Sequence, residues 1–133
     1  MNAKKIIATA TELIAAEKTR SAWSNGVKVY AAELLADLAE SAPDAIAKGN
    51  RSDLLTAMLN GASNWNNYSW GGCALIYDED IAARLCTPSE LKKTRNGERR
   101  PNGREEWLDV QARALRQAAE RVVKAIEQAR KDA

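Results

Sequence analysis

Apolar residues recur at three- and four-residue intervals through the N-terminal third of the chain. That spacing places them on one face of a helix, with lysine, glutamate and threonine filling the other faces. The pattern is interrupted at Ser24-Asn25-Gly26 and stops before Ala42-Pro43-Asp44. It therefore predicts two amphipathic helices, one over residues 3–19 and one that begins at residue 27 and ends before Ala42-Pro43-Asp44. Their apolar positions are Ala3, Ile6, Ile7, Ala10, Leu13 and Ile14 in the first and Val27, Tyr30, Ala31, Leu34, Leu35 and Leu38 in the second.

A turn and a third, shorter helix are predicted next. Lys48-Gly49-Asn50 is typical of a turn, and Ser52-Asp53 is a suitable N-terminal cap. The apolar residues that follow keep helical spacing until Asn60-Gly61, a pair that commonly ends a helix. We therefore expect a short helix between these two signals.

Capping signals predict two more short helices in the second half of the chain. Three acidic residues at 78–80 precede apolar positions with helical spacing, and acids at a helix start are favoured by the helix dipole, so 78–86 is predicted to be helical. Thr87-Pro88-Ser89-Glu90 forms a capping box with proline at the first helical position, which predicts a helix from 88 to about 94. Residues 74–77 are four consecutive apolar residues and are compatible with either a strand or a helix.

The C-terminal segment predicts one long helix. From Arg104 to the end there is neither glycine nor proline, and successive apolar residues are spaced alternately four and three positions apart. At ~1.5 Å per residue, such a helix is roughly 40 Å long, enough to span a domain of this size. Its seam is rich in alanine, which permits close approach of another helix, so we expect it to organise the fold. The seam residues are Leu108, Ala112, Leu115, Ala119, Val122, Ile126 and Ala129, widened by Trp107, Val110, Ala114 and Ala118.

Length and composition support the same fold class. A chain of 133 residues fits one domain, so residues 1–133 are predicted to form a single unit. Alanine, leucine, isoleucine and valine supply nearly all the apolar content, while aromatics are only 5% and phenylalanine is absent. This composition favours helix over strand. We predict a compact all-α domain, a bundle of five or six helices packed around the long C-terminal one.

Residue types exclude several kinds of active site. The chain has no histidine, which removes the commonest general base, and Cys73 and Cys86 cannot complete a zinc site by themselves. No phosphate-binding glycine motif is present. Asp78 and Asp80 offer a metal-dependent enzyme site as an alternative, although acids at a helix start are more often part of a solvated surface. We therefore expect a non-enzymatic protein with no cofactor.

A basic cluster is the strongest indication of a binding surface. Between Ile81 and Arg104 there are seven basic residues against Glu90 and Glu98, a net charge of +5, whereas the remaining chain carries −3. Arginine and lysine in a loop suit an acidic protein surface or nucleic acid, and a helix start at Arg104 adds backbone N–H donors for an anion. The alternatives are internal pairing with residues 78–80 or a solvated face. The candidate binding residues are Lys92, Lys93, Arg95, Arg99, Arg100 and Arg104.

Aromatic residues concentrate just before this cluster. Trp65, Tyr68 and Trp70 lie among asparagine, serine and glycine, residues that usually build loops. Tryptophan and tyrosine stack on bases and anchor protein interfaces, so these three are candidate binding residues. The competing interpretation is that the two tryptophans fill the core, against Trp107 for instance. We predict a stretch that is partly core and partly binding surface.

Part of the chain resembles a known group of proteins. The runs that carry the resemblance are S-W-G-G-C-A-L-I-Y-D-E-D-I-A (residues 69–82), L-C-T-P-S-E-L-K-K-T-R-N-G-E-R-R-P-N (85–102) and R-E-E-W-L-D-V-Q-A-R-A-L (104–115). Over about residues 64–120 the chain resembles small uncharacterised proteins of prophages and conjugative elements in gut bacteria. The resemblance implies an accessory protein of a mobile element and carries over no binding or catalytic residue.

Compartment and assembly are also predicted. The apolar run at the N-terminus is broken at Thr9, Thr11 and Glu12, unlike a signal peptide, and no stretch approaches the ~20 apolar residues that span a bilayer. We expect a cytoplasmic protein with reduced thiols and no membrane partner. Pairing of the alanine seam between chains would make a homo-oligomer, which is a further expectation.

Overall fold

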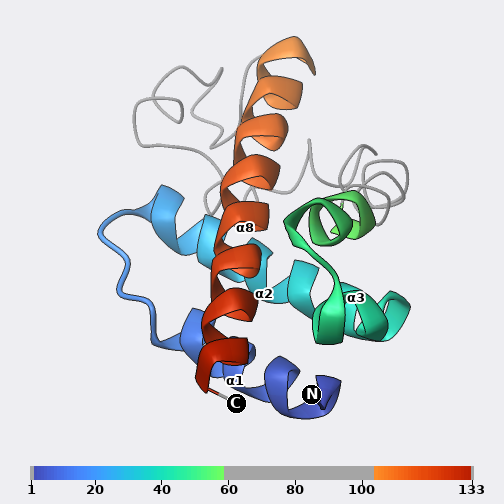
Figure 1. Ribbon diagram of the computed structural model, residues 1–133. Helices are drawn as coiled ribbons and strands as arrows, with labels where there is room; N and C mark the ends of the chain where they lie inside the picture. The colour runs from blue at the N-terminus through green and yellow to red at the C-terminus, as the bar shows by residue number, and fades with distance from the viewer. Residues whose placement is uncertain (1, 59–103, 133) are drawn as a thin grey trace.

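A computed structural model describes residues 2–58 and 104–132, with backbone alone for residues 22–23 and 104–112. It contains α1 (Ala3–Ala16), α2 (Ala22–Ser41), α3 (Pro43–Lys48), a helical segment over 51–58 and α8 (Arg104–Asp132) (Figure 1). These ranges hold no strand. The prediction of an all-α fold with a long C-terminal helix packed on the others is confirmed.

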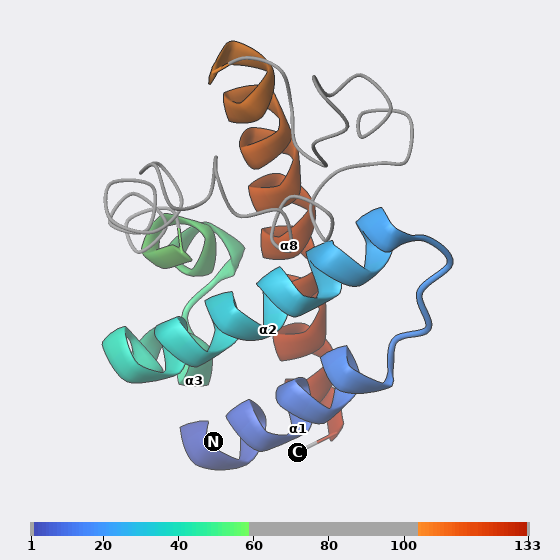
Figure 2. The same cartoon turned by 180° about the vertical axis from the view of Figure 1, so that it is seen from behind.

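The helices are arranged around the crossing of α8 over α1 and α2. α1 and α2 lie next to each other, and α8 runs across the same side of both (Figures 1 and 2). The short α3 contacts α1 and α2. The C-terminal end of α8 lies close to α1, so the two ends of the described chain meet in one part of the molecule.

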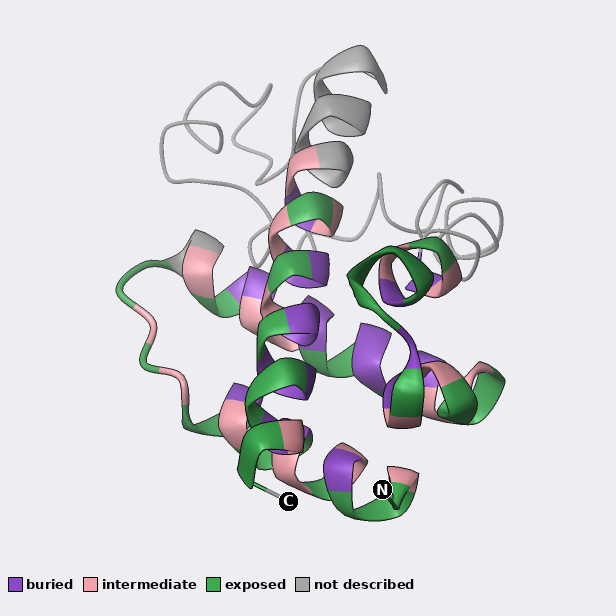
Figure 3. Cartoon of the chain, in the orientation of Figure 1, coloured by how far each residue is buried: buried purple, intermediate pink, exposed green. Residues whose placement is uncertain are grey.

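One apolar core fills the space between these helices. The buried positions of α1, Ile6, Ala10 and Ile14, have the spacing of a single helical face, and all belong to the predicted face. Among the residues whose burial is described, Tyr30 on α2 is the largest that is almost fully buried. Where burial is described, the buried positions lie on the sides of the helices that are turned toward other helices, and the exposed positions lie on the outside (Figure 3). The apolar periodicity thus identified the core-facing positions of both N-terminal helices.

The seam of α8 is buried largely as predicted. In the part of α8 whose side chains are described, the buried alanines are Ala114, Ala118, Ala119, Ala125 and Ala129, and the larger buried residues are Val122, Val123 and Ile126. Leu115 is only half-buried. Val123 and Ala125 were not predicted to be in the seam, and they widen the buried stripe because α8 packs on α1 and α2 together.

The boundaries of α1 and α2 differ from the prediction. α1 ends at Ala16 instead of residue 19, because Glu17 is extended and its N–H returns to the carbonyl of Ile14 at 3.2 Å. α2 begins at Ala22, so the expected interruption at Ser24-Asn25-Gly26 is wrong. Ser21 caps this helix by accepting a hydrogen bond from the Ser24 N–H at 3.1 Å. The serine and asparagine that suggested a loop lie in the first turn of a capped helix.

The connection after α2 contains a helix that was not predicted. Pro43, taken from the sequence as a stop, is the first residue of α3, a position that suits its fixed φ. The predicted cap at Ser52-Asp53 is also wrong: Asn50 is the capping residue. Asn50 Oδ1 accepts from the Asp53 N–H at 2.8 Å, while Asp53 Oδ2 accepts from the Asn50 N–H at 3.0 Å. This reciprocal pair starts the helix over 51–58.

Of the predicted turn at Lys48-Gly49-Asn50, Lys48 is the last residue of α3, and Gly49 and Asn50 connect α3 to the helix over 51–58. This connection requires its glycine. The Gly49 N–H donates to the Ala45 carbonyl at 2.8 Å. A Cβ at position 49 would lie 2.7 Å from that carbonyl oxygen, so any side chain would push the turn away from α3. The close approach directs the chain from α3 into the next helix.

Arg130 ties the last turns of α8 to α3. Its Nη2 donates to the carbonyls of Ala45 and Ile46 at 2.8 and 2.7 Å, and its Nε donates to Ile46 at 3.0 Å. These carbonyls lie near the C-terminal end of a short helix, where a cation is favoured, and the Ala45 carbonyl accepts from Arg130 in addition to the Gly49 N–H. One half-buried guanidinium thus connects residues more than eighty positions apart.

We predict that Arg130→Met lowers the free energy of unfolding by about 2 kcal/mol, because it leaves two carbonyls of α3 without their charged donor. Urea denaturation followed by circular dichroism measures the loss. The control is Lys131→Met, which removes a neighbouring exposed cation and should change stability by less than about 0.5 kcal/mol. Equal stability of the two variants would contradict the role given to Arg130.

The cap at Asn50 gives a second prediction. Asn50→Ala removes the side chain that accepts the Asp53 N–H and should lower the free energy of unfolding by about 1 kcal/mol. Ser52→Ala, at an exposed position of the predicted cap, should leave it unchanged within about 0.5 kcal/mol. Urea unfolding of both variants distinguishes the observed cap from the one expected from the sequence; a larger loss for Ser52→Ala would contradict it.

Candidate binding site

Most of the residues predicted to bind lie outside the described residues. This holds for all three aromatic candidates and for five of the six basic ones: Trp65, Tyr68, Trp70, Lys92, Lys93, Arg95, Arg99 and Arg100. The alternative metal site at Asp78 and Asp80 also lies outside them, as do Cys73 and Cys86. Arg104 is the first residue of α8, so the predicted helix start at this position is confirmed. The surface made by the basic cluster and the aromatics stays a prediction.

Within the described residues, a groove lies where α8 crosses the C-terminal half of α1. Its volume is about 450 Å³. Leu13 and Ile14 of α1 and Ala125 of α8 give it an apolar floor. Its polar lining residues are Glu17, Arg121, Lys124 and Gln128. The groove therefore combines apolar surface with charged groups, as small-molecule sites commonly do.

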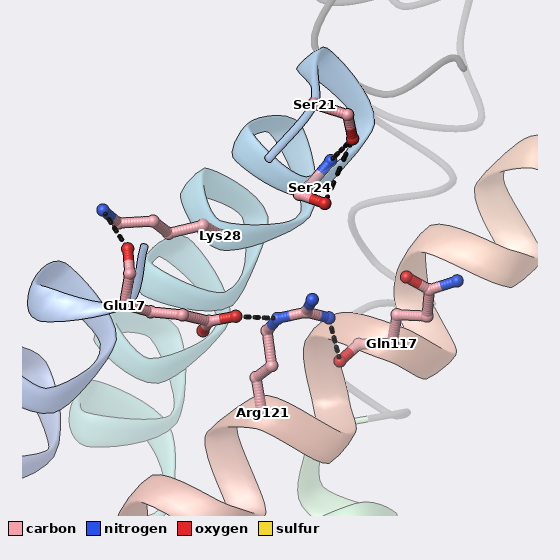
Figure 4. A network of polar contacts seen from close by, with 6 residues as sticks. All are labelled: Glu17, Ser21, Ser24, Lys28, Gln117 and Arg121. Carbon is pink, nitrogen blue, oxygen red and sulfur yellow. Dashed lines mark hydrogen bonds and ion pairs between the residues drawn. The ribbon is translucent and has the colours of Figure 1, made fainter. Parts of the chain in front are cut away.

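A network of hydrogen bonds connects the residues at one edge of this groove (Figure 4). Arg121 Nε donates to Glu17 Oε1 at 2.8 Å, and Arg121 Nη1 donates to the Gln117 carbonyl at 3.4 Å. On the far side of Glu17, the Lys28 ammonium donates to its backbone carbonyl at 2.9 Å. Three helix regions are thereby joined: the end of α1, the first half of α2 and the middle of α8.

Local structure explains why Glu17 reaches α8. α1 ends at Ala16, and Glu17 leaves the helix with an extended backbone. Its carbonyl lies at the negative end of the helix dipole, where the Lys28 ammonium is favourably placed. With the backbone fixed in this way, the carboxylate meets Arg121 from the opposite end of the sequence.

The ion pair positions the guanidinium more than it stabilises the fold. The side chains of Arg121 and Glu17 are 27% and 34% exposed, so solvent screens their attraction. Among the described residues, no hydrogen bond involves Arg121 Nη2. Lys124 is exposed and has no hydrogen bond or ion pair with any residue the structure describes. Arg121 and Glu17 are thus paired with each other in the groove, whereas the Lys124 ammonium has no partner among the described residues.

Tyr30 is a titratable group that belongs to the core. Burial raises the pKa of its phenol far above the ordinary value near 10, and the negative charges of Glu33 and Asp37 raise it further. Tyr30 is therefore neutral at physiological pH. Its predicted position on the apolar face of the second helix is confirmed, and it fills the core.

The two described ranges hold neither a cluster of metal-ligating side chains nor a membrane-spanning helix. Residues 2–58 and 104–132 contain no group of three or more histidine, cysteine, aspartate or glutamate side chains placed to hold a metal ion. No helix in these ranges combines the length and the apolar character needed to cross a membrane. Neither finding concerns residues 59–103.

Sequence reasoning did not identify the groove. Leu13 and Ile14 were assigned to the apolar face of the first predicted helix, and Arg121 and Lys124 were given no role. A signal existed, since Glu17 follows Leu13 by four residues and Arg121, Lys124 and Gln128 share one face of α8. What the sequence lacks is the information that these two faces meet.

In comparisons with known proteins, no protein-family model, curated protein or solved structure matches this chain. The resemblance of residues 64–120 to proteins of prophages and conjugative elements accordingly stays a prediction from the sequence.

Proposed function

We propose that this protein is a non-enzymatic binding module whose partner is anionic, either an acidic protein surface or nucleic acid. The binding surface combines Arg95, Arg99 and Arg100 with the aromatic residues of 65–70, and Lys92, Lys93 and Arg104 add to its charge. An accessory role of this kind suits the mobile-element setting that the sequence resemblance implies.

The observation that carries the proposal is the start of α8 at Arg104. The basic cluster ends there, at the first turn of a helix of 29 residues. Free N–H groups and the positive end of the helix dipole lie at such a start, next to the cationic side chains in the sequence. Further along, the helix is anchored by Ala118, Val122 and Ile126 in the core. A cationic segment attached to a fixed helix loses less conformational freedom on binding than a free one.

Charge provides the second line of support. The residues between Ile81 and Arg104 carry +5 although the whole chain carries only +2. Arginine, which supplies most of this charge, pairs with phosphate and carboxylate through two parallel hydrogen bonds. Both partner classes present those groups, so partner identity has to be measured.

We predict that Arg99→Glu combined with Arg100→Glu weakens binding to the anionic partner by at least tenfold. The probes are duplex DNA, single-stranded DNA, RNA and poly-glutamate, titrated by fluorescence anisotropy at several salt concentrations. For a nucleic acid, affinity should fall steeply with salt, since phosphate contacts release counterions. Binding to poly-glutamate alone would identify an acidic protein as the partner class.

The matched control is Lys4→Glu combined with Lys5→Glu. This pair is adjacent, exposed and at the start of α1, so it changes the net charge by the same amount at a distant place in the sequence. It should retain most of the wild-type affinity. The proposal is wrong if no probe binds, or if the two double variants lose affinity equally.

A further inference from the structure

The groove between α1 and α8 has two chemically different parts. Leu13, Ile14 and Ala125 supply apolar surface, while Arg121 and Lys124 bring two cations from α8. None of these residues belongs to the basic cluster or to the aromatic stretch. The groove is therefore made of other residues than those of the proposed function.

The charges of the groove favour a ligand with one negative charge. Among the described residues that line the groove, Glu17 is the only acidic one, and its Oε1 accepts a hydrogen bond from Arg121 Nε at 2.8 Å. That bond fixes the guanidinium and leaves Nη2 without a hydrogen bond to any described residue. Lys124 forms no hydrogen bond or ion pair with any described residue and lies about one helical turn further along α8. Two cations against one carboxylate leave the groove with an excess of one positive charge.

Size and shape favour a small molecule over a helix of a partner protein. About 450 Å³ lies within the range of ligand pockets, roughly 300 to 1,000 Å³. α8 crosses α1 instead of running alongside it (Figures 1 and 2), and the described residues that line the groove fall within positions 13–17 and 121–128, a short stretch of each helix. A partner helix docks through anchors spread over several turns, which requires a longer groove.

We infer that the α1–α8 groove binds a small amphipathic anion, a carboxylate on an apolar chain. The chain lies on Leu13, Ile14 and Ala125, where it is removed from water. The carboxylate lies at the cationic edge and accepts hydrogen bonds from Lys124 Nζ and from Arg121 Nη2. Glu17 orients Arg121 and does not contact the ligand.

The test is isothermal titration calorimetry of the full chain with decanoate, below the concentration at which it forms micelles. Wild type should bind one decanoate in a saturable manner. Lys124→Gln should weaken binding roughly fivefold to tenfold, because it removes one charged hydrogen-bond donor. The control Lys131→Gln, an exposed cation of α8 that does not line the groove, should bind as wild type does.

Two further variants test the apolar part without changing the charge. Ala125→Leu fills the groove and should abolish binding. Leu13→Gln, at a half-buried position, should weaken binding, and it tests the apolar floor even where Ala125→Leu does not fold. Circular dichroism of each variant establishes that it is folded.

Three results would overturn the inference. The first is the absence of saturable binding by the wild type. The second is undiminished affinity in both Lys124→Gln and the folded variants of the apolar floor. The third is equal binding of decyltrimethylammonium, which has the same apolar chain and the opposite charge. Because the basic cluster is unchanged in all these variants, none of these results decides whether the proposed anionic macromolecular partner exists.

Discussion

The fold depends on the close packing of an alanine-rich helix face against two other helices. Ala114, Ala118 and Ala129 of α8 are almost completely buried. Side chains of this size let the backbone of α8 approach α1 and α2, while Val122 and Ile126 fill the remaining space. Interiors are packed densely enough that one additional methylene group at such a position is felt. The distance between the helices is therefore set by which residues are alanine.

The other features follow from this packing. Because α8 lies tightly across α1, Arg121 reaches the carboxylate that leaves the end of α1, and Arg130 reaches the carbonyls of α3. The groove exists beside the same crossing, bounded by Leu13 on one helix and Lys124 on the other. The C-terminal helix thus positions groups drawn from the whole N-terminal part of the chain.

Prediction from the sequence succeeded for features that depend on the residues of a single helix. Apolar spacing identified the buried faces of α1 and α2 and the seam of α8, since a helix repeats every 3.6 residues whatever surrounds it. It failed at helix boundaries, which depend on a few polar atoms. Ser21 caps α2 ahead of a serine and a glycine that suggested a loop, and Pro43 begins a helix instead of ending one. The groove escaped prediction because Glu17 and Arg121 are 104 positions apart, and no local pattern encodes their meeting.

The central claim is that alanine in the seam sets the distance between helices, and replacing Ala118 with leucine tests it most directly. Ala118 is fully buried, so the larger side chain should force α8 away from its neighbours. Urea denaturation should show a loss of about 1 to 3 kcal/mol in the free energy of unfolding. The same replacement at Ala36, on the exposed face of α2, should change it by less than about 0.5 kcal/mol. If Ala118→Leu were as stable as wild type, the seam would have room to spare and the account would be contradicted.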